Sequence, residues 1–288
     1  MTDLANTFKV SRPTIYSWRK QKFELTKQHF VVKDLVNSIR KFMPRIGSVK
    51  LYHILKFDML IEGVDIGRDK FHKMLKHLCL LVPRKKKFFR TTQSNHLFNK
   101  HSNLVKGMKI NKPEQLWVSD ITYLKTSNGS MYLSLITDAY SKKIVGYEVS
   151  DNLKAESSKK ALIMALKNRK YPKRKLIHHS DRGIQYCCPE YTDVLDHHKI
   201  KISMTQKYDP YENAIAERIN GILKQEFDIS SYRTTKQQTP NIVKNAIHIY
   251  NNFRPHFSCN LMTPNQAHLK GKFKYKKWGN FSITEHWN

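Results

Sequence analysis

The spacing of hydrophobic residues changes near position 113, and this change divides the chain into a helical part and a mixed part. Before position 113, apolar residues recur every three or four positions, as they do on one face of a helix. Three amphipathic helices are predicted there, at 31–43, 48–60 and 68–78. After position 113, short apolar runs separated by turn signals, such as the one at 127–129, predict strands.

A regular order of strands and helices is predicted after position 113. In chain order the elements are strands at 116–124, 130–140 and 142–150, a helix at 155–169, a strand at 175–181, a helix at 189–199, a strand at 200–206 and a helix at 212–227. This order is that of a ribonuclease H-like α/β fold. In such a fold the first and fourth strands lie side by side at the centre of the sheet.

Three acidic residues lie in segments that give little structural reason for them. Asp120 interrupts the first predicted strand, Asp181 ends the fourth, and Glu217 lies in the last predicted helix, with 35 residues (217 − 181 − 1) between the second and third acids. A buried acid costs on the order of several kcal/mol unless it is paired or bound to a metal. The pattern therefore predicts a two-metal phosphoryl-transfer site.

The last predicted helix is expected to direct Glu217 toward the two aspartates, which face each other on the central strands. Four residues share one face of this helix at 3.6 residues per turn: Asn213, Glu217, Asn220 and Lys224. Glu226 lies nine residues after Glu217, about 180° around the axis, so it is expected to face away, either solvated or paired with a lysine. Taken singly, each of the three acids is equally well explained as a surface or capping carboxylate.

The charge of the chain points to a polyanionic partner. The sequence has 52 Lys and Arg against 23 Asp and Glu, a formal net charge of +29. Residues 1–112 contribute 25 − 7 = +18, and residues 113–288 contribute 27 − 16 = +11. Such a surplus suits nucleic acid. A lysine-rich solvated surface is the alternative, but it explains scattered lysines better than the dense blocks at 84–90 and 167–175.

The N-terminal part contains two candidate DNA-binding units. Residues 4–20 have the pattern of a helix-turn-helix, in which Ser11 caps a second helix that presents Arg12 and Arg19 to the major groove. A helical hairpin that only packs is the alternative. In the second unit, Arg68 and Lys70 begin the helix at 68–78, where a recognition helix carries its base-reading residues.

The segment after these two units is predicted to be a basic linker. It opens at Pro83 and contains four consecutive basic candidates for DNA contact: Arg84, Lys85, Lys86 and Lys87. The expected organisation is therefore a helix-turn-helix at 1–26, a second helix-turn-helix at 27–82, a linker at 83–112, a catalytic core at 113–230, and a helical extension with a basic tail at 231–288.

Several other classes of protein are disfavoured by the sequence. The N-terminus is polar and no apolar run approaches membrane-spanning length, so a soluble, cytoplasmic protein is expected. The four cysteines form no CxxC pair, which argues against a disulfide framework or a zinc ribbon. A zinc site built from His178, His179, Cys187 and Cys188 is also disfavoured, because neighbouring residues on a strand face opposite sides.

Several motifs resemble one family closely. They are WVSDITY at 117–123, IHHSDRGIQY at 177–186, YENAIAERINGILKQE at 211–226 and YNNFRPHFSCNLMTP at 250–264. With them, residues 113–271 resemble the integrase-type catalytic core of bacterial insertion-sequence transposases, specifically the second-reading-frame protein of the insertion-sequence-three family. Segments 44–55 and 66–81 resemble the winged helix-turn-helix that precedes this core. One departure is mild: Glu212 stands where the family often has Asp.

The resemblance implies a function for the acidic residues. Asp120, Asp181 and Glu217 would be the metal-binding triad of a DDE transposase using two Mg²⁺ or Mn²⁺ ions, and Lys224 would contact DNA near the scissile phosphate. The protein would cut and join double-stranded DNA at element ends and target, as a homo-oligomer on DNA near the bacterial nucleoid. An upstream-frame protein would be its fusion partner or a separate partner.

Two alternatives to this function remain open from the sequence. The chain could be a non-catalytic DNA-binding product, or an inactive partial transposase that regulates transposition, because the active enzyme of this family is usually a fusion of two reading frames. A host nuclease of ribonuclease H type is less favoured, since a degradative enzyme needs no sequence-reading helices at its N-terminus.

Overall fold

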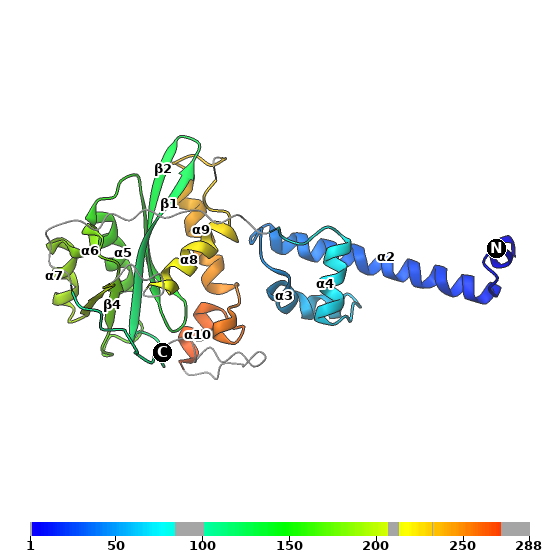
Figure 1. Ribbon diagram of the computed structural model, residues 1–288, viewed down its shortest axis with the longest axis horizontal. Coiled ribbons are helices and arrows are strands. Elements are labelled where there is room, and N and C mark those ends of the chain that lie inside the picture. Colours follow the sequence, from blue (N-terminus) through cyan, green and yellow to red (C-terminus); the bar gives the residue numbers. More distant parts are fainter. Residues whose placement is uncertain (1, 84–100, 207–212, 232, 272–288) are drawn as a thin grey trace. The chain divides into compact units, whose positions relative to one another are not determined.

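The computed structural model describes residues 2–83, 101–206, 213–231 and 233–271, and it separates the chain into two compact units, Met1–Arg84 and Lys85–Asn288 (Figure 1). The division falls at the start of the predicted linker. The basic candidates Arg84, Lys85, Lys86 and Lys87 lie outside the described residues, as does Glu212.

The first unit is helical throughout its described part. Its helices are α1 (Thr2–Thr7), α2 (Arg12–Arg40), α3 (Ser48–Ile61) and α4 (Arg68–His77). Its core comes from the apolar positions that repeat at three- and four-residue spacing, among them Val32, Val36, Leu51, Leu55, Phe71 and Leu75. Residues 2–83 contain no strand, so the expected wing is not found in that range.

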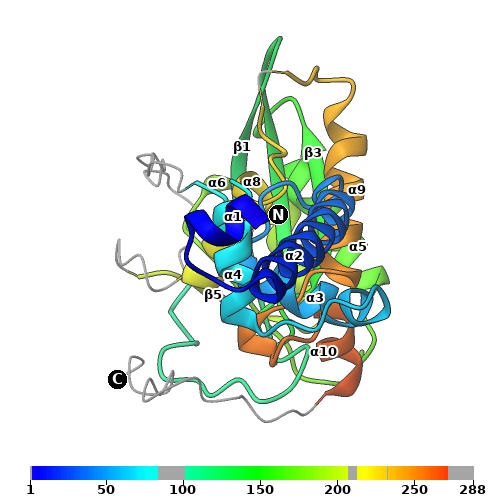
Figure 2. The same cartoon turned by 90° about the vertical axis from the view of Figure 1, so that its right-hand side faces the viewer.

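Helix α2 corrects one part of the prediction. Separate helices were expected on either side of a boundary at residue 26, yet one helix of 29 residues runs through that boundary (Figures 1 and 2). It begins as predicted, with the Ser11 side chain accepting a hydrogen bond from the Thr14 amide. Residues 21–30 contain no glycine or proline, so nothing in them stops a helix once it has started.

The second unit is built on a five-stranded mixed sheet. The strands are β1 (Leu116–Thr126), β2 (Gly129–Asp138), β3 (Ile144–Ser150), β4 (Ile177–Ser180) and β5 (Lys201–Met204), in the order β3-β2-β1-β4-β5. β1 pairs antiparallel with β2 and parallel with β4. The predicted ribonuclease H-like order is confirmed, and the first and fourth strands are neighbours at the centre.

Helices cover both faces of this sheet. Figure 1 shows α5 (Ala155–Lys167), α6 (Ile184–Cys187) and α7 (Pro189–His197) on one side, and α8 (Ala214–Gln225) and α9 (Thr239–Asn252) on the other. Successive residues of β1 point to the two layers in turn: Trp117 packs in the core beneath α5 and α7, whereas Val118 packs with Ala216 of α8. The short helix α6 was not predicted, because four residues carry no periodic signal.

The C-terminal extension packs against the sheet and belongs to the same compact unit. It contains α9, a 3₁₀ turn (Phe257–Cys259) and α10 (Pro264–Lys270). Near the end of α9, the Asn251 side chain makes two hydrogen bonds with the backbone of Ile144 on the edge strand β3, at 3.0 and 2.9 Å. The amide therefore satisfies backbone groups that an edge strand would leave unpaired.

Candidate active site

The pairing of β1 with β4 runs up to two residues before the first two predicted acids, Asp120 and Asp181. Val118 pairs with His179 in this parallel ladder. The ladder ends at this pair, and its register continued by two residues on each strand would bring Asp120 opposite Asp181. Because side chains alternate along strands, both carboxylates then project toward the face that α8 covers.

Helix α8 contacts the first of these acids directly. The Asn220 side-chain amide donates a hydrogen bond of 2.8 Å to Oδ2 of Asp120. Asn220 is buried, whereas Asp120 is half-buried. Glu217 lies three residues before Asn220, in the first turn of α8 and on the same side of the helix, and it too is half-buried. The predicted helical face is therefore the one that meets β1.

Lys224 lies on the same face of α8, one turn beyond Asn220. Burial lowers its pKa, while the nearby negative charge of Asp120 acts in the opposite direction and Lys125 adds to the lowering. Asp120 and Lys224 are therefore electrostatic neighbours. An amine held close to a carboxylate and partly withdrawn from water can interact with an incoming phosphate more strongly than a fully solvated lysine does.

The opposite face of the sheet carries a buried histidine. His178 Nε2 lies 2.7 Å from the Ser119 hydroxyl of β1 and 2.9 Å from the Tyr191 hydroxyl of α7. Burial, together with the neighbouring His179, lowers the pKa of His178 to about 3, so the imidazole is neutral. His179 points to the other face, where it meets the Ser203 hydroxyl at 2.9 Å. The two histidines therefore do not converge on one ion.

The donor atoms near Asp120 suit a hard divalent cation. Carboxylate and amide oxygens are the ligands that Mg²⁺ takes, and the amide oxygen of Asn220 is buried without a hydrogen-bond partner among the described residues. Within the same residues, no group of three His, Cys, Asp or Glu side chains could hold one metal ion. Glu217 therefore does not form a three-carboxylate cluster with the two aspartates in this arrangement.

Glu226 corrects a second prediction. It follows α8 directly and accepts two hydrogen bonds from the guanidinium of Arg254, at 2.7 Å from Nε and 2.8 Å from Nη2. The side chains are 17% and 1% exposed respectively. Glu226 is therefore largely buried and paired with an arginine that lies far away in the sequence.

A buried acidic cluster was missed by the sequence argument. Glu114 and Asp138 are both completely buried, and His268 of α10 lies 3.3 Å from the first carboxylate and 3.7 Å from the second. Burial by itself would lower the pKa of His268, but its hydrogen bonds with the two carboxylates outweigh this and raise it. Asp138 interrupts an apolar run just as Asp120 does, so the signal that selected Asp120 could have found it.

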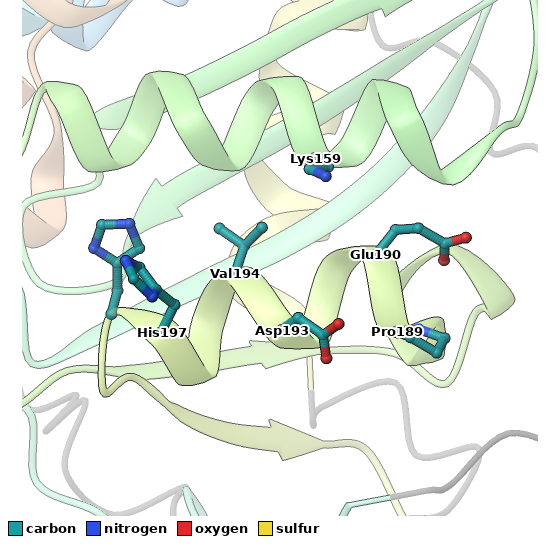
Figure 3. Close-up of a pocket in the computed structure, with 7 residues that line it drawn as sticks. Lys159, Pro189, Glu190, Asp193, Val194 and His197 are labelled. Carbon is teal, nitrogen blue, oxygen red and sulfur yellow. The ribbon is translucent and has the colours of Figure 1, made fainter.

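A groove lies on the face of the sheet away from α8. It has a volume of about 600 Å³ and is lined by Lys159 of α5 and by α7 residues that include Glu190, Asp193 and His197 (Figure 3). None of Asp120, Asp181 and Glu217 lines it.

The predicted DNA-contact residues of the first unit lie on two of its helices. Arg12 and Arg19 are exposed on α2, where their seven-residue spacing places them on one side. Arg68 and Lys70 are exposed in the first turn of α4. Arg68 also forms a salt bridge of 2.9 Å with Asp69. No helix in the described ranges is long and apolar enough to cross a membrane.

Comparison with known proteins finds relatives along almost the whole chain. Two models described as "Integrase core domain" match residues 110–210 and 198–264. The "Insertion element IS600 uncharacterized 31 kDa protein" of Shigella sonnei is 33% identical over 271 residues, which cover 91% of this chain and 96% of that protein. "Transposase InsF for insertion sequence IS3A" of Escherichia coli (strain K12) is 28% identical over 273 residues, 93% of each chain.

Solved structures give more distant matches. The catalytic core domain of the HTLV-2 integrase, solved in complex with magnesium, has a TM-score of 0.44 at 18% identity and covers 55% of this chain and 97% of that chain. The simian T-cell lymphotropic virus intasome has a TM-score of 0.47, also at 18% identity, and covers 81% of this chain and 74% of the matched chain.

Proposed function

We propose that Asp120, Asp181 and Glu217 carry the DNA cleavage and strand-transfer chemistry of this chain. The chain belongs to the insertion-sequence-three family of DDE transposases with an integrase catalytic core. The observation that supports this assignment best is the parallel register of β1 and β4, whose continuation by two residues would bring Asp120 and Asp181 to one level of the sheet. Membership of this family rules out a host nuclease of ribonuclease H type as the main function.

The proposed reaction displaces one oxygen of a DNA phosphodiester by another. Asp120 and Asp181 would hold divalent ions through their carboxylate oxygens, and Glu217 would complete the ligand set from α8. When bound, two Mg²⁺ or Mn²⁺ ions supply charge stabilisation to the attacking and leaving oxygens of an in-line displacement. The attacking group is water during cleavage and a DNA 3′-hydroxyl during strand transfer, so no residue of the chain needs to act as a covalent nucleophile.

The neighbouring side chains have supporting roles in this proposal. The Asn220 amide holds Oδ2 of Asp120 by its hydrogen bond of 2.8 Å and so fixes the direction in which the carboxylate faces. The Lys224 ammonium would bind a phosphate oxygen next to the scissile bond. On the far side of the sheet, the bond between Ser119 and His178 ties β1 to β4 and maintains the register on which the pair of aspartates depends.

A comparison of charge-neutralising variants tests the assignment. Asp120→Asn, Asp181→Asn and Glu217→Gln are each expected to abolish Mg²⁺-dependent cleavage of element-end DNA while binding of the same DNA persists. Asp193→Asn is the matched control, because Asp193 is an exposed acid of the same unit on the opposite face. Cleavage near the parent rate in any of the first three variants would refute the role of that residue.

We also propose that the first unit supplies sequence-specific DNA affinity, with α4 as the recognition helix. Arg68 and Lys70 are the residues in its first turn that can reach base edges, whereas Arg12 and Arg19 on α2 suit phosphate contacts. In the full-length chain, Lys70→Gln should reduce the preference for element-end over random DNA. Arg19→Gln should weaken binding to element-end DNA and to random DNA about equally, and should reduce the salt dependence of log K against log[salt] by about one unit of slope. Equal effects of the two variants on specificity would contradict this division.

Assembly completes the proposal. Two element ends and a target must be handled together, so we propose a homo-oligomer on DNA, either with an upstream-frame protein as a partner or fused to it. Cross-linking and light scattering with and without element-end DNA test this. A complex that holds two element ends but only one protein chain would contradict the proposed homo-oligomer.

A further inference from the structure

A glycine two residues after Asp181 lies against the carboxylate of that residue. The backbone amide of Gly183 donates a hydrogen bond of 3.0 Å to Oδ1 of Asp181. Gly183 is buried and stands immediately before helix α6. The orientation of the Asp181 carboxylate is therefore coupled to the position of this one residue.

The backbone of Gly183 does not require glycine. Its φ of −63° and ψ of 142° are values that any L-residue adopts. Another reason must explain why a residue without a side chain stands here, and that reason is the space around its Cα.

A side chain at this position would collide with the carboxylate. A Cβ atom added to Gly183 would lie 3.0 Å from Oδ1 of Asp181 and 3.1 Å from Oε1 of Gln185, both closer than ordinary van der Waals contact. The Gln185 amide is fixed by a hydrogen bond of 3.0 Å to the carbonyl of Leu153. The contact with Oδ1 of Asp181 is the closer of the two, and relieving it moves this oxygen by a few tenths of an ångström.

We propose that Gly183 is a positioning residue for Asp181. Because Gly183 has no side chain, the Asp181 carboxylate can keep the orientation in which the Gly183 backbone amide holds it. The inference rests on the proposed role of Asp181 as a metal ligand. A methyl group at position 183 would turn Oδ1 away from that orientation. Because Mg²⁺ demands near-ideal octahedral geometry, a turned carboxylate binds it more weakly even though its charge is unchanged.

The test compares two glycine-to-alanine variants of the full-length protein. Gly183→Ala is expected to raise the Mn²⁺ concentration needed for half-saturation about tenfold or more, as measured by electron paramagnetic resonance titration. Its melting temperature without metal and its affinity for element-end DNA should stay close to those of the parent. Gly221→Ala is the matched control, because Gly221 lies beside Asn220 in α8 and a Cβ there would meet nothing within 4 Å. Alanine also favours the helix, so the control should bind Mn²⁺ like the parent and melt no earlier.

A third variant separates this inference from the assignment of Asp181 itself. Asp181→Asn should lose Mn²⁺ binding. If it binds Mn²⁺ like the parent, the proposed function of Asp181 fails; if it loses binding while Gly183→Ala keeps the parent affinity, only the role of Gly183 fails. Should Gly183→Ala not fold, Gly183→Ala/Gln185→Ala removes the second close contact and is measured in its place. Parent-like affinity in that double variant, or its failure to fold, would also overturn the inference.

Discussion

The ion pair between Glu226 and Arg254 predicts that two glutamates near one helix fail in different ways when they are neutralised. Glu217→Gln should leave a stable protein that does not cleave DNA. Glu226→Gln should give a less stable protein that still cleaves at low temperature. The two positions lie nine residues apart, on opposite sides of α8, so a single change to glutamine probes the two faces of the helix separately.

The cost of Glu226→Gln follows from the burial of its partner. Removing one member of a buried ion pair costs about 3–5 kcal/mol, because the remaining charge is left uncompensated. Arg254 is 1% exposed, but Glu226 is 17% exposed and glutamine can still accept one of the two hydrogen bonds. We therefore expect a loss of about 2–3 kcal/mol. For a unit of roughly 200 residues, this corresponds to a fall in melting temperature of roughly 5–10 °C.

Thermal melts without metal, followed by DNA cleavage at 15 °C, separate the two variants. Glu156→Gln is the stability control, because Glu156 forms an exposed salt bridge with Lys160 one helical turn away and should leave the melting temperature unchanged. Glu226→Gln/Arg254→Met removes both charges and should regain part of the stability that the single change loses.

Two results would refute this reasoning. An unchanged melting temperature for Glu226→Gln would mean that the pair with Arg254 contributes nothing to the fold. A folded Glu226→Gln protein without cleavage activity, together with an active Glu217→Gln protein, would mean that the wrong face of α8 has been assigned to the site.

Three further predictions concern other parts of the second unit. Asp120→Asn and Asp181→Asn should each leave the metal-free melting temperature equal to or above that of the parent, because loss of one carboxylate relieves repulsion from the other. A clearly lower melting temperature in either variant would argue against two closely spaced carboxylates. Gly146→Ala should cost about 3 kcal/mol or more in urea unfolding, since its Cβ would lie 2.1 Å from the backbone oxygen of Ala161, and a neutral result would contradict the close packing of β3 on α5. The pKa of His268 is raised, so its stabilising contribution is complete below its unfolded pKa of about 6.5 and is lost as the pH rises through the higher folded value. Melting temperatures from pH 6 to 9 should show this loss in the parent. His268→Gln should make the melting temperature less dependent on pH over this range.

Much of the second unit could be predicted from the sequence because its signals are local. Alternation and short apolar runs located the five strands, and the order of strands and helices fixed which strands are neighbours. The prediction that Asp120 lies opposite Asp181 follows from this topology, because parallel central strands place equivalent positions side by side. The face of α8 followed in the same way from a period of 3.6 residues, and its contact with β1 through Asn220 agrees with it.

The same signals could not tell structural acids from ligand-binding ones. They show where an acid lies along the chain and not which side chains contact it in the folded protein. Asp138 interrupts an apolar run as Asp120 does, yet it is buried against the Ser141 hydroxyl and amide at 2.6 and 2.8 Å. Whether a carboxylate within the sheet is structural or open to a ligand depends on segments far along the chain, such as α10 with His268.

What the sequence determined by itself is the strands and longer helices of the second unit, their order and the faces they present, because each depends on neighbours within a few residues. The tertiary structure decided the partners of buried charge and the use of space. Arg254 reaches Glu226 across 28 residues, and His268 reaches Glu114 across 154. Such pairings carry no periodic signature, since desolvation selects a partner by proximity in the folded chain. The close approach of the Asp181 carboxylate to Gly183 likewise has no signature in the sequence.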